Sequence, residues 1–205
     1  MTRKNPQMNS GERSEERTEK LKSVLAKRQP TLTVILENIN DPHNVSACLR
    51  SCDAVGVLEV CLVYHGTQLM PKLGKKSSAS AKKWVDTRVF DSIEKCYDYV
   101  RDSEKKIYTT HMAKDSVSLY SLKLAEPVAL VFGNEHEGVS EQAVKLADGN
   151  FLIPQVGLIQ SLNISVACAV SLYEAYRQRL EAGMYEKLQF GDLEFEEKMN
   201  DWLSR

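Results

Sequence analysis

Short apolar runs alternate with stretches of helical periodicity along most of this chain. Apolar runs rich in β-branched residues predict buried strands at residues 32–36, 57–64, 106–110 and 127–132. Amphipathic stretches between them predict helices at residues 45–54, 92–102 and 140–146. Strands that alternate with helices favour an α/β fold, in which a mostly parallel sheet carries helices on both faces.

The two ends of the chain differ from this pattern. Leu21, Val24 and Leu25 repeat at helical spacing with charges on the opposite face, which predicts an amphipathic helix over residues 14–27. Pro30 ends that helix, because proline cannot continue it. We therefore expect three parts: a basic N-terminal helical extension at residues 1–29, a main domain at 30–180 and a C-terminal helical tail at 181–205.

The stretch from residue 151 to residue 176 has the layout of a ligand site. A short apolar run at 151–153 breaks at Pro154, and the polar residues Ser161 and Asn163 precede a long apolar helix that begins near Ile164. A polar cluster between a strand and a helix typically lies at the carboxyl end of a parallel sheet, where α/β proteins bind ligands. The alternative is that Ser161 or Asn163 only caps the helix.

Two further polar clusters follow predicted strands. Asn44 and Arg50 lie six residues, nearly two turns, apart on one predicted helix, and we expect them to lie roughly on the same side. The guanidinium of Arg50 could bind a phosphate or stabilise a developing negative charge. The alternative is that Asn44 only caps the helix and Arg50 is an ordinary surface residue. Gly133 and Gly138 lie on either side of Glu135, and glycines at these positions would let the backbone approach a ligand closely. The alternative is a turn with exposed acidic side chains.

Charge is distributed unevenly in a chain whose net charge is only −1. Residues 1–30 hold eight Lys or Arg against four Glu, and residues 72–88 hold six basic residues against one Asp. Residues 181–205 hold three basic residues against seven acidic ones. The two basic blocks indicate a surface for an anionic partner, although each block alone is equally typical of a solvated surface.

The cysteines indicate a reducing compartment. All five lack a CxxC pairing or a nearby set of metal ligands, so we expect reduced, mostly buried thiols and no metal site. The first residues lack the apolar core of a signal peptide, and we find no stretch long enough to span a membrane. We therefore expect a cytoplasmic protein without a membrane partner.

The three polar clusters together resemble the three motifs of the SpoU/TrmH family of the SPOUT superfamily. The matching segments are N-x-x-A-x-x-R at 44–50, L-V-F-G-N-E-x-x-G-V-S at 130–140 and I-P-Q-V-G-L-I-Q-S-L-N-I-S-V-A at 153–167. This family comprises S-adenosylmethionine-dependent RNA ribose 2′-O-methyltransferases. The resemblance covers roughly residues 30–180, and flanking segments such as Lys83-Trp84-Val85 are similar to the tRNA branch, which methylates the D-loop guanosine at tRNA position 18.

The resemblance implies a fold, a cofactor and an assembly. It implies a deep C-terminal trefoil knot over about residues 130–170, and a homodimer whose pocket is completed near the subunit interface. It implies that S-adenosyl-L-methionine binds largely to backbone groups. The corresponding cofactor-binding positions in this sequence are Thr110, Gly133, Ile153 and Leu162.

The resemblance also implies catalytic residues. Arg50 is the central one, and Asn44, Glu135, Ser161 and Asn163 orient it, the ribose and the methionine moiety. A guanidinium does not readily lose its proton, so Arg50 is better suited to stabilising the developing alkoxide and holding the adjacent phosphate than to acting as a base.

Basic residues outside the motifs are candidates for binding tRNA. The residues that we expect to contact RNA are Arg17, Arg28, Lys83, Arg177 and Arg179. Two alternatives to a D-loop methyltransferase remain open. One is the same chemistry on the tRNA wobble ribose or on ribosomal RNA, and the other is a catalytically silent RNA-binding knot protein.

Overall fold

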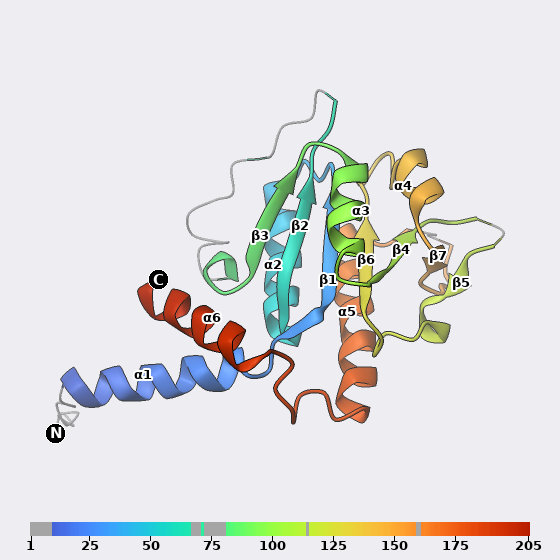
Figure 1. The fold of residues 1–205 in the computed structure, drawn as a ribbon. Coiled ribbons are helices and arrows are strands. Elements are labelled where there is room, and N and C mark those ends of the chain that lie inside the picture. The colour runs from blue at the N-terminus through green and yellow to red at the C-terminus, as the bar shows by residue number, and fades with distance from the viewer. Residues whose placement is uncertain (1–9, 67–70, 72–80, 114, 159–160) are drawn as a thin grey trace, which may run out of the picture.

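The computed structural model describes residues 10–66, 71, 81–113, 115–158 and 161–205. The first residues of the predicted N-terminal extension and most of the lysine-rich stretch at 72–83 lie outside the described residues. Within the described part, seven strands form one sheet in the order β3-β2-β1-β6-β4-β7-β5 (Figure 1), and each pair of neighbours runs parallel. The predicted parallel α/β sheet is confirmed.

The strands lie close to the predicted positions. Their bounds are β1 Gln29–Glu37, β2 Val57–Val63, β3 Asp86–Phe90, β4 Lys106–Thr110, β5 Val117–Ser118, β6 Val128–Phe132 and β7 Gly149–Leu152. The edge strand β5 was not predicted, because two residues are too few to show an alternating pattern.

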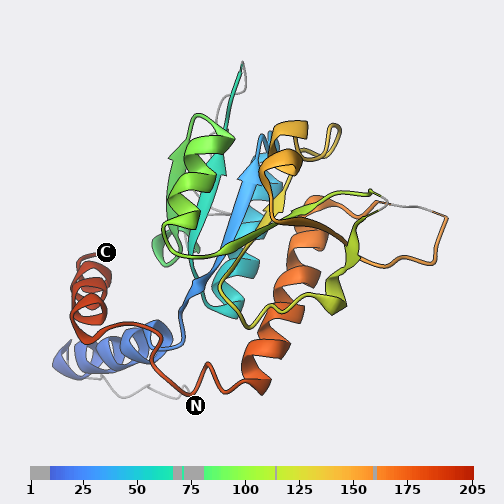
Figure 2. The same ribbon diagram turned by 45° about the vertical axis from the view of Figure 1, so that its right-hand side comes forward.

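Helices cover both faces of the sheet, as predicted (Figure 2). On one face lie α2 (Pro42–Val55) and α5 (Ile164–Glu181), and on the other lie α3 (Ile93–Arg101) and α4 (Glu141–Leu146). The helix that we predicted at 45–54 begins three residues earlier. Asp41 caps it by accepting a hydrogen bond from His43 N at 2.8 Å, and Pro42 fits the first helical position.

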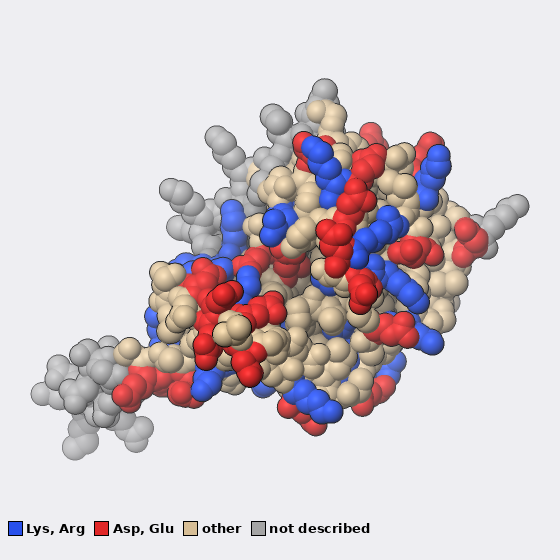
Figure 3. Space-filling view, in the orientation of Figure 1, with Lys and Arg blue, Asp and Glu red and all other residues tan. Residues whose placement is uncertain are grey.

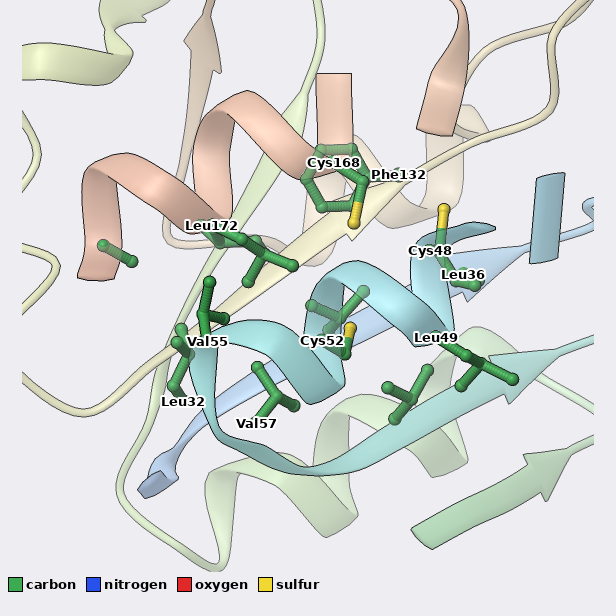
Figure 4. Close-up of a cluster of buried hydrophobic side chains, with 14 of the residues drawn as sticks. Leu32, Leu36, Cys48, Leu49, Cys52, Val55, Val57, Phe132, Cys168 and Leu172 are labelled. Atoms are coloured by element: carbon green, nitrogen blue, oxygen red, sulfur yellow. The ribbon is translucent and has the colours of Figure 1, made fainter. Parts of the chain in front are cut away.

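The core has one layer on each side of the sheet. Alternate residues of β1 point to opposite faces, so Leu32 and Leu36 pack under α2 and α5 while Ile35 packs under α3. Figure 4 shows Cys48 and Cys168 between α2 and α5. All five cysteines are buried and free. Contact with the Cys168 thiol, together with burial, raises the pKa of Cys48, so this thiol stays protonated.

The two terminal helices pack on each other below the sheet, as Figure 1 shows. α1 (Ser10–Leu25) and α6 (Asp192–Ser204) share a small apolar cluster with the start of β2. Lys198 Nζ and Arg205 Nη2 bind the Asp86 carboxylate at 2.5 and 2.7 Å, which ties α6 to β3. Acidic side chains gather over the outer face of α6 (Figure 3), so this helix presents negative charge to solvent.

Two expectations from the sequence concern the chain as a whole. The trefoil knot depends on how the chain threads through its own loops, which strand order does not determine, and it stays a prediction. None of the described helices combines the length and the apolar character that a membrane crossing requires.

Candidate active site

A cavity of about 390 Å³ lies at the carboxyl ends of β4, β6 and β7. The motif segments at 130–140 and 153–167 both contribute to its wall, and apolar side chains such as Phe132 and Ala167 line its interior. Seven residues with a predicted role line it together: Thr110, Gly133, Glu135, Ile153, Ser161, Leu162 and Asn163. The structure therefore brings four expected cofactor-binding positions and three expected catalytic residues into one hollow.

Gly133 has a steric reason to be glycine. A Cβ atom there would lie 2.1 Å from the carbonyl carbon of Gly138 and from the backbone nitrogen of Val139. The loop therefore folds back on itself at the cavity wall, and Asn134 forms an antiparallel bridge with Gly138. Gly138 has a φ of +70°, a left-handed conformation that glycine adopts at little cost.

Hydrogen bonds join the three motifs beside the cavity. Asn44 Nδ2 donates to Glu135 Oε1 at 2.5 Å, and Asn163 Nδ2 donates to Asn44 Oδ1 at 3.3 Å. Each residue comes from a different motif, and the side chains form one continuous polar chain. Asn44 is the third residue of α2 and does not cap it, so that part of the alternative is wrong, whereas Arg50 does lie at the surface. The expectation that Asn44 and Arg50 share one side of the helix is also wrong, because six residues at about 100° each turn the two side chains well apart.

Asn163 combines both roles that we considered for it. Its Oδ1 accepts a hydrogen bond from Ser165 N at 2.9 Å and so caps α5, while its Nδ2 reaches Asn44. Capping thus fixes the direction of the amide that points toward the other motifs. Ser161 does not cap α5 and lies exposed at the cavity.

Arg50 lies outside this cavity. It is exposed in a shallow hollow on the outer face of α2 and α5, which it shares with Ala47, Ser51, Ala54 and Tyr173. Its side chain makes no hydrogen bond or ion pair with any of the described residues. The expectation that Asn44 orients Arg50 is not met within this chain, because Asn44 is bonded to Glu135 and Asn163 instead.

Burial is the main reason that the pKa of Tyr64, a phenol near Glu135, is raised. Burial, with a smaller contribution from the Glu135 carboxylate, raises the pKa of Tyr64 to about 12. The Tyr64 hydroxyl donates to Ile39 O at 3.0 Å. Tyr64 is therefore a structural donor at neutral pH. Among the described residues we find no group of three or more His, Cys, Asp or Glu placed to hold a metal ion.

Two of the five residues that we predicted to contact RNA are buried, so those two predictions are wrong. Arg28 pairs with Asp53, donates to Val57 O at 3.0 Å and lies over the Trp202 ring. Arg179 donates to the carbonyl oxygens of Leu124, Thr31 and Glu126. Both side chains are 0% exposed, so a phosphate in solvent cannot reach either guanidinium group.

The other three are at the surface. Arg17 lies on the exposed side of α1, and Lys83 ends a short 3₁₀ turn before β3. Arg177 is half exposed but pairs with Glu174 and Glu181 on its own helix. Their contact with RNA stays a prediction.

Sequence reasoning missed a buried polar group below the cavity. Glu37, the last residue of β1, is 1% exposed and hydrogen-bonded to Ser140 of the second motif. A signal was present, because a carboxylate directly follows a run of buried strand residues, where an unpartnered charge is costly.

The fold and the arrangement of the three motifs agree with the comparison to known families. The profile of the SpoU rRNA Methylase family matches residues 31–173, and the chain belongs to this family.

Particular relatives are similar along nearly the whole chain. The tRNA (guanosine(18)-2′-O)-methyltransferase of Thermus thermophilus is 42% identical over 194 residues, which are 95% of this chain and 99% of the relative. The solved structure of the A. aeolicus TrmH/SpoU tRNA modifying enzyme has a TM-score of 0.86 and 36% identity and covers 93% of this chain and 96% of its own. The SpoU methyltransferase AviRb of Streptomyces viridochromogenes, solved with AdoMet, has a TM-score of 0.67 and 25% identity over 77% and 64% of the two chains. The predicted family is confirmed.

Proposed function

We propose that this protein transfers a methyl group from S-adenosylmethionine to the ribose 2′-hydroxyl of the D-loop guanosine at position 18 of tRNA. The observation that carries the proposal is the hydrogen-bonded set of Asn44, Glu135 and Asn163, which joins the three motifs at one cavity. The similarity to the Thermus thermophilus enzyme supports the choice of tRNA, because it extends over 95% of the chain and so includes the terminal extensions.

The cavity suits S-adenosylmethionine in size and character. Its wall combines apolar side chains, including Ile153 and Leu162, with the tight backbone turn at Gly133. An adenine ring suits such an apolar slot, and the polar groups of the cofactor suit backbone hydrogen-bonding groups. Thr110, Gly133, Ile153 and Leu162 would hold the cofactor, which supplies a methyl group on a positively charged sulfur.

Arg50 is proposed to stabilise charge on the nucleophile. A ribose hydroxyl attacks only as it loses its proton, and the developing alkoxide is stabilised by a fixed cation. The Arg50 guanidinium supplies that cation and can bind the adjacent phosphate in a fork. The proton passes to that phosphate or to water. At the cavity, Asn44, Glu135, Ser161 and Asn163 position the ribose and the methionine moiety.

A homodimer explains the position of Arg50. The outer face of α2 and α5 is unusually apolar for an exposed surface: Val166 is 46% and Tyr173 is 55% exposed. Arg50 lies on that same face and outside the cavity of its own chain. A second copy that covers this face brings Arg50 to the subunit interface, where it completes a site.

The enzyme is proposed to act in the cytoplasm, with tRNA as its macromolecular partner. Five free, buried thiols suit a reducing compartment. Arg17, Lys83 and Arg177 are proposed to bind tRNA phosphates, so affinity for tRNA should fall steeply as salt rises.

The test is methyl transfer from labelled S-adenosylmethionine to an unmodified tRNA transcript, followed by nucleoside mapping. We expect label as 2′-O-methylguanosine at position 18, and none when that nucleotide is 2′-deoxyguanosine. In the Arg50→Lys variant we expect most of the turnover to be lost, because lysine keeps the charge but not the fork. A near wild-type rate in that variant contradicts the role of Arg50.

The other outcomes separate the alternatives. Label at the wobble ribose keeps the chemistry and changes the tRNA site, and label only on ribosomal RNA removes tRNA as the substrate. No label on any RNA, with cofactor still bound, indicates a silent RNA-binding protein.

A further inference from the structure

Glu37 is a buried carboxylate that no lysine or arginine neutralises among the described residues. It ends the interior strand β1 and is 1% exposed. Its Oε2 accepts from Ser140 N at 2.8 Å, and its Oε1 accepts from Ser140 Oγ at 2.6 Å. A carboxylate is costly to bury unless hydrogen bonds satisfy its oxygens, so these contacts give Glu37 a defined orientation.

Ser140 is the point where the 133–140 loop ends and α4 begins. Its side-chain oxygen accepts from Ala143 N at 3.1 Å and caps the helix. Its backbone and hydroxyl donors both go to Glu37. The helix start and the end of the loop are therefore held at the end of β1 by one side chain.

The other end of the same loop is held at Asn38, the residue that follows β1. Asn134 Nδ2 donates to Asn38 O at 2.9 Å. Asn38 has a φ of +53°, a left-handed conformation that is uncommon outside glycine, and this turn directs its carbonyl toward Asn134. Glu37 and Asn38 thus clamp both ends of a loop that is distant in sequence.

His65 covers the remaining side of the carboxylate. Its Nε2 lies 3.0 Å from Glu37 Oε1 and 3.1 Å from Asn38 Nδ2, and its backbone N–H donates to Asn38 Oδ1 at 3.2 Å. His65 follows β2, so Glu37 connects the ends of β1 and β2 with the start of α4. The contact also excludes water from the carboxylate, which strengthens its bonds to Ser140.

The clamped loop carries two residues of the proposed site. Gly133 lines the cavity beside Asn134, and Glu135 follows and meets Asn44. We propose that Glu37 is a positioning residue for methyl transfer: through Ser140 it holds the 133–140 loop so that Gly133 faces the cofactor and Glu135 reaches Asn44. This inference rests on the proposed function for its effect on turnover, but its effect on cofactor binding does not depend on the RNA substrate.

The test compares Glu37→Gln and Ser140→Ala with the wild-type protein. Glutamine keeps one acceptor oxygen but sets an NH₂ group against the Ser140 donors, and alanine removes the hydroxyl. We measure the Kd for S-adenosylhomocysteine by calorimetry without RNA, and the single-turnover methyl-transfer rate at saturating cofactor. We expect each variant to lose roughly tenfold or more in both, because the loop is displaced from a geometry that transfer requires.

Ser92→Ala is the matched control. Ser92 caps α3 on the same face of the sheet by accepting from Lys95 N at 3.3 Å, and among the described residues no hydrogen bond joins it to the 133–140 loop. We expect Ser92→Ala to lower Tm as Ser140→Ala does and to leave Kd and rate within about twofold of wild type. Ser140→Thr keeps the hydroxyl and should restore both.

Two results overturn the inference. One is folded Glu37→Gln protein that binds S-adenosylhomocysteine and transfers methyl groups as the wild type does. The other is a Ser92→Ala variant that loses as much as Ser140→Ala, which would make the effect one of general stability. Wild-type protein that methylates another RNA, or none, contradicts the proposed function and leaves the calorimetric comparison valid.

Discussion

At the residue scale, Arg177 and Arg179 show how two neighbouring arginines of one helix serve different purposes. Arg179 donates to three carbonyl oxygens and to the side chains of Gln29 and Thr31, and no carboxylate of the described residues pairs with it. Burial lowers its pKa to about 10, which still leaves it charged at neutral pH. Arg179 therefore links the end of α5 to the start of β1 and to the segment before β6.

We predict that Arg179→Ala lowers the free energy of unfolding by about 3 kcal/mol or more, because it leaves several buried carbonyl oxygens without donors. Arg177→Ala should cost far less, because its ion pairs with Glu174 and Glu181 lie at the solvent-exposed surface and are screened there. Urea unfolding of the two variants measures the difference. Equal losses would mean that the buried bonds of Arg179 are not a main source of stability.

At the scale of elements, α6 is held by a compact set of contacts around Asp86. Burial disfavours the charged form of this carboxyl, but hydrogen bonds from Arg205 and Lys198 outweigh it, so the pKa of Asp86 lies below its ordinary value. A lowered pKa means that the ionised form stabilises the folded protein. That contribution is present above the unfolded pKa, about 3.9, and is lost as pH falls through the lower folded value.

We predict that Asp86→Asn loosens α6 at neutral pH, and that its stability difference from the wild type begins to shrink below pH about 4 and disappears as pH falls through the lower folded pKa. The chain has two tryptophans, Trp84 and Trp202, whose ring centroids lie 5.2 Å apart in this cluster. Their fluorescence during urea unfolding therefore reports on α6. Asp91→Asn is the control, because Asp91 pairs with Lys95 at the exposed surface. A difference that persists in acid would contradict the role of the Asp86 charge.

At the scale of the whole molecule, the exposed apolar face of α2 and α5 supports the proposed homodimer. We predict that Val166→Glu yields a monomer of 23.1 kDa, while the wild type has twice that mass. A glutamate there would be buried without a partner between two copies. Val89→Glu is the matched control, because Val89 is 54% exposed on the edge strand β3. Light scattering after gel filtration gives the mass, and a dimeric Val166→Glu protein would remove this face as the interface.

The sequence predicted the elements and the site residues better than it predicted the order of the strands. The strand order could not be derived from the pattern, but the alternation of strands and helices was correct, because burial on two faces leaves a strong local signal. The motif spacing placed Gly133, Glu135 and Asn163 in one cavity, since each follows a strand whose carboxyl end lies at the same sheet edge. The burial of Arg179 also had a signal: it lies on the stripe of α5 that contains Cys168, Leu172 and Ala175.

The sequence by itself determined the class of fold, the family and the residues that can carry the chemistry, because periodicity and motif spacing are local properties of the chain. Only the tertiary structure decided which charged side chains are exposed and can bind a ligand. It buried Arg28, left Arg50 on an outer face, and joined Glu37 to Ser140 across 103 positions. Such outcomes depend on which groups meet after folding, since a charged side chain is stable either in water or among partners that only the folded chain provides.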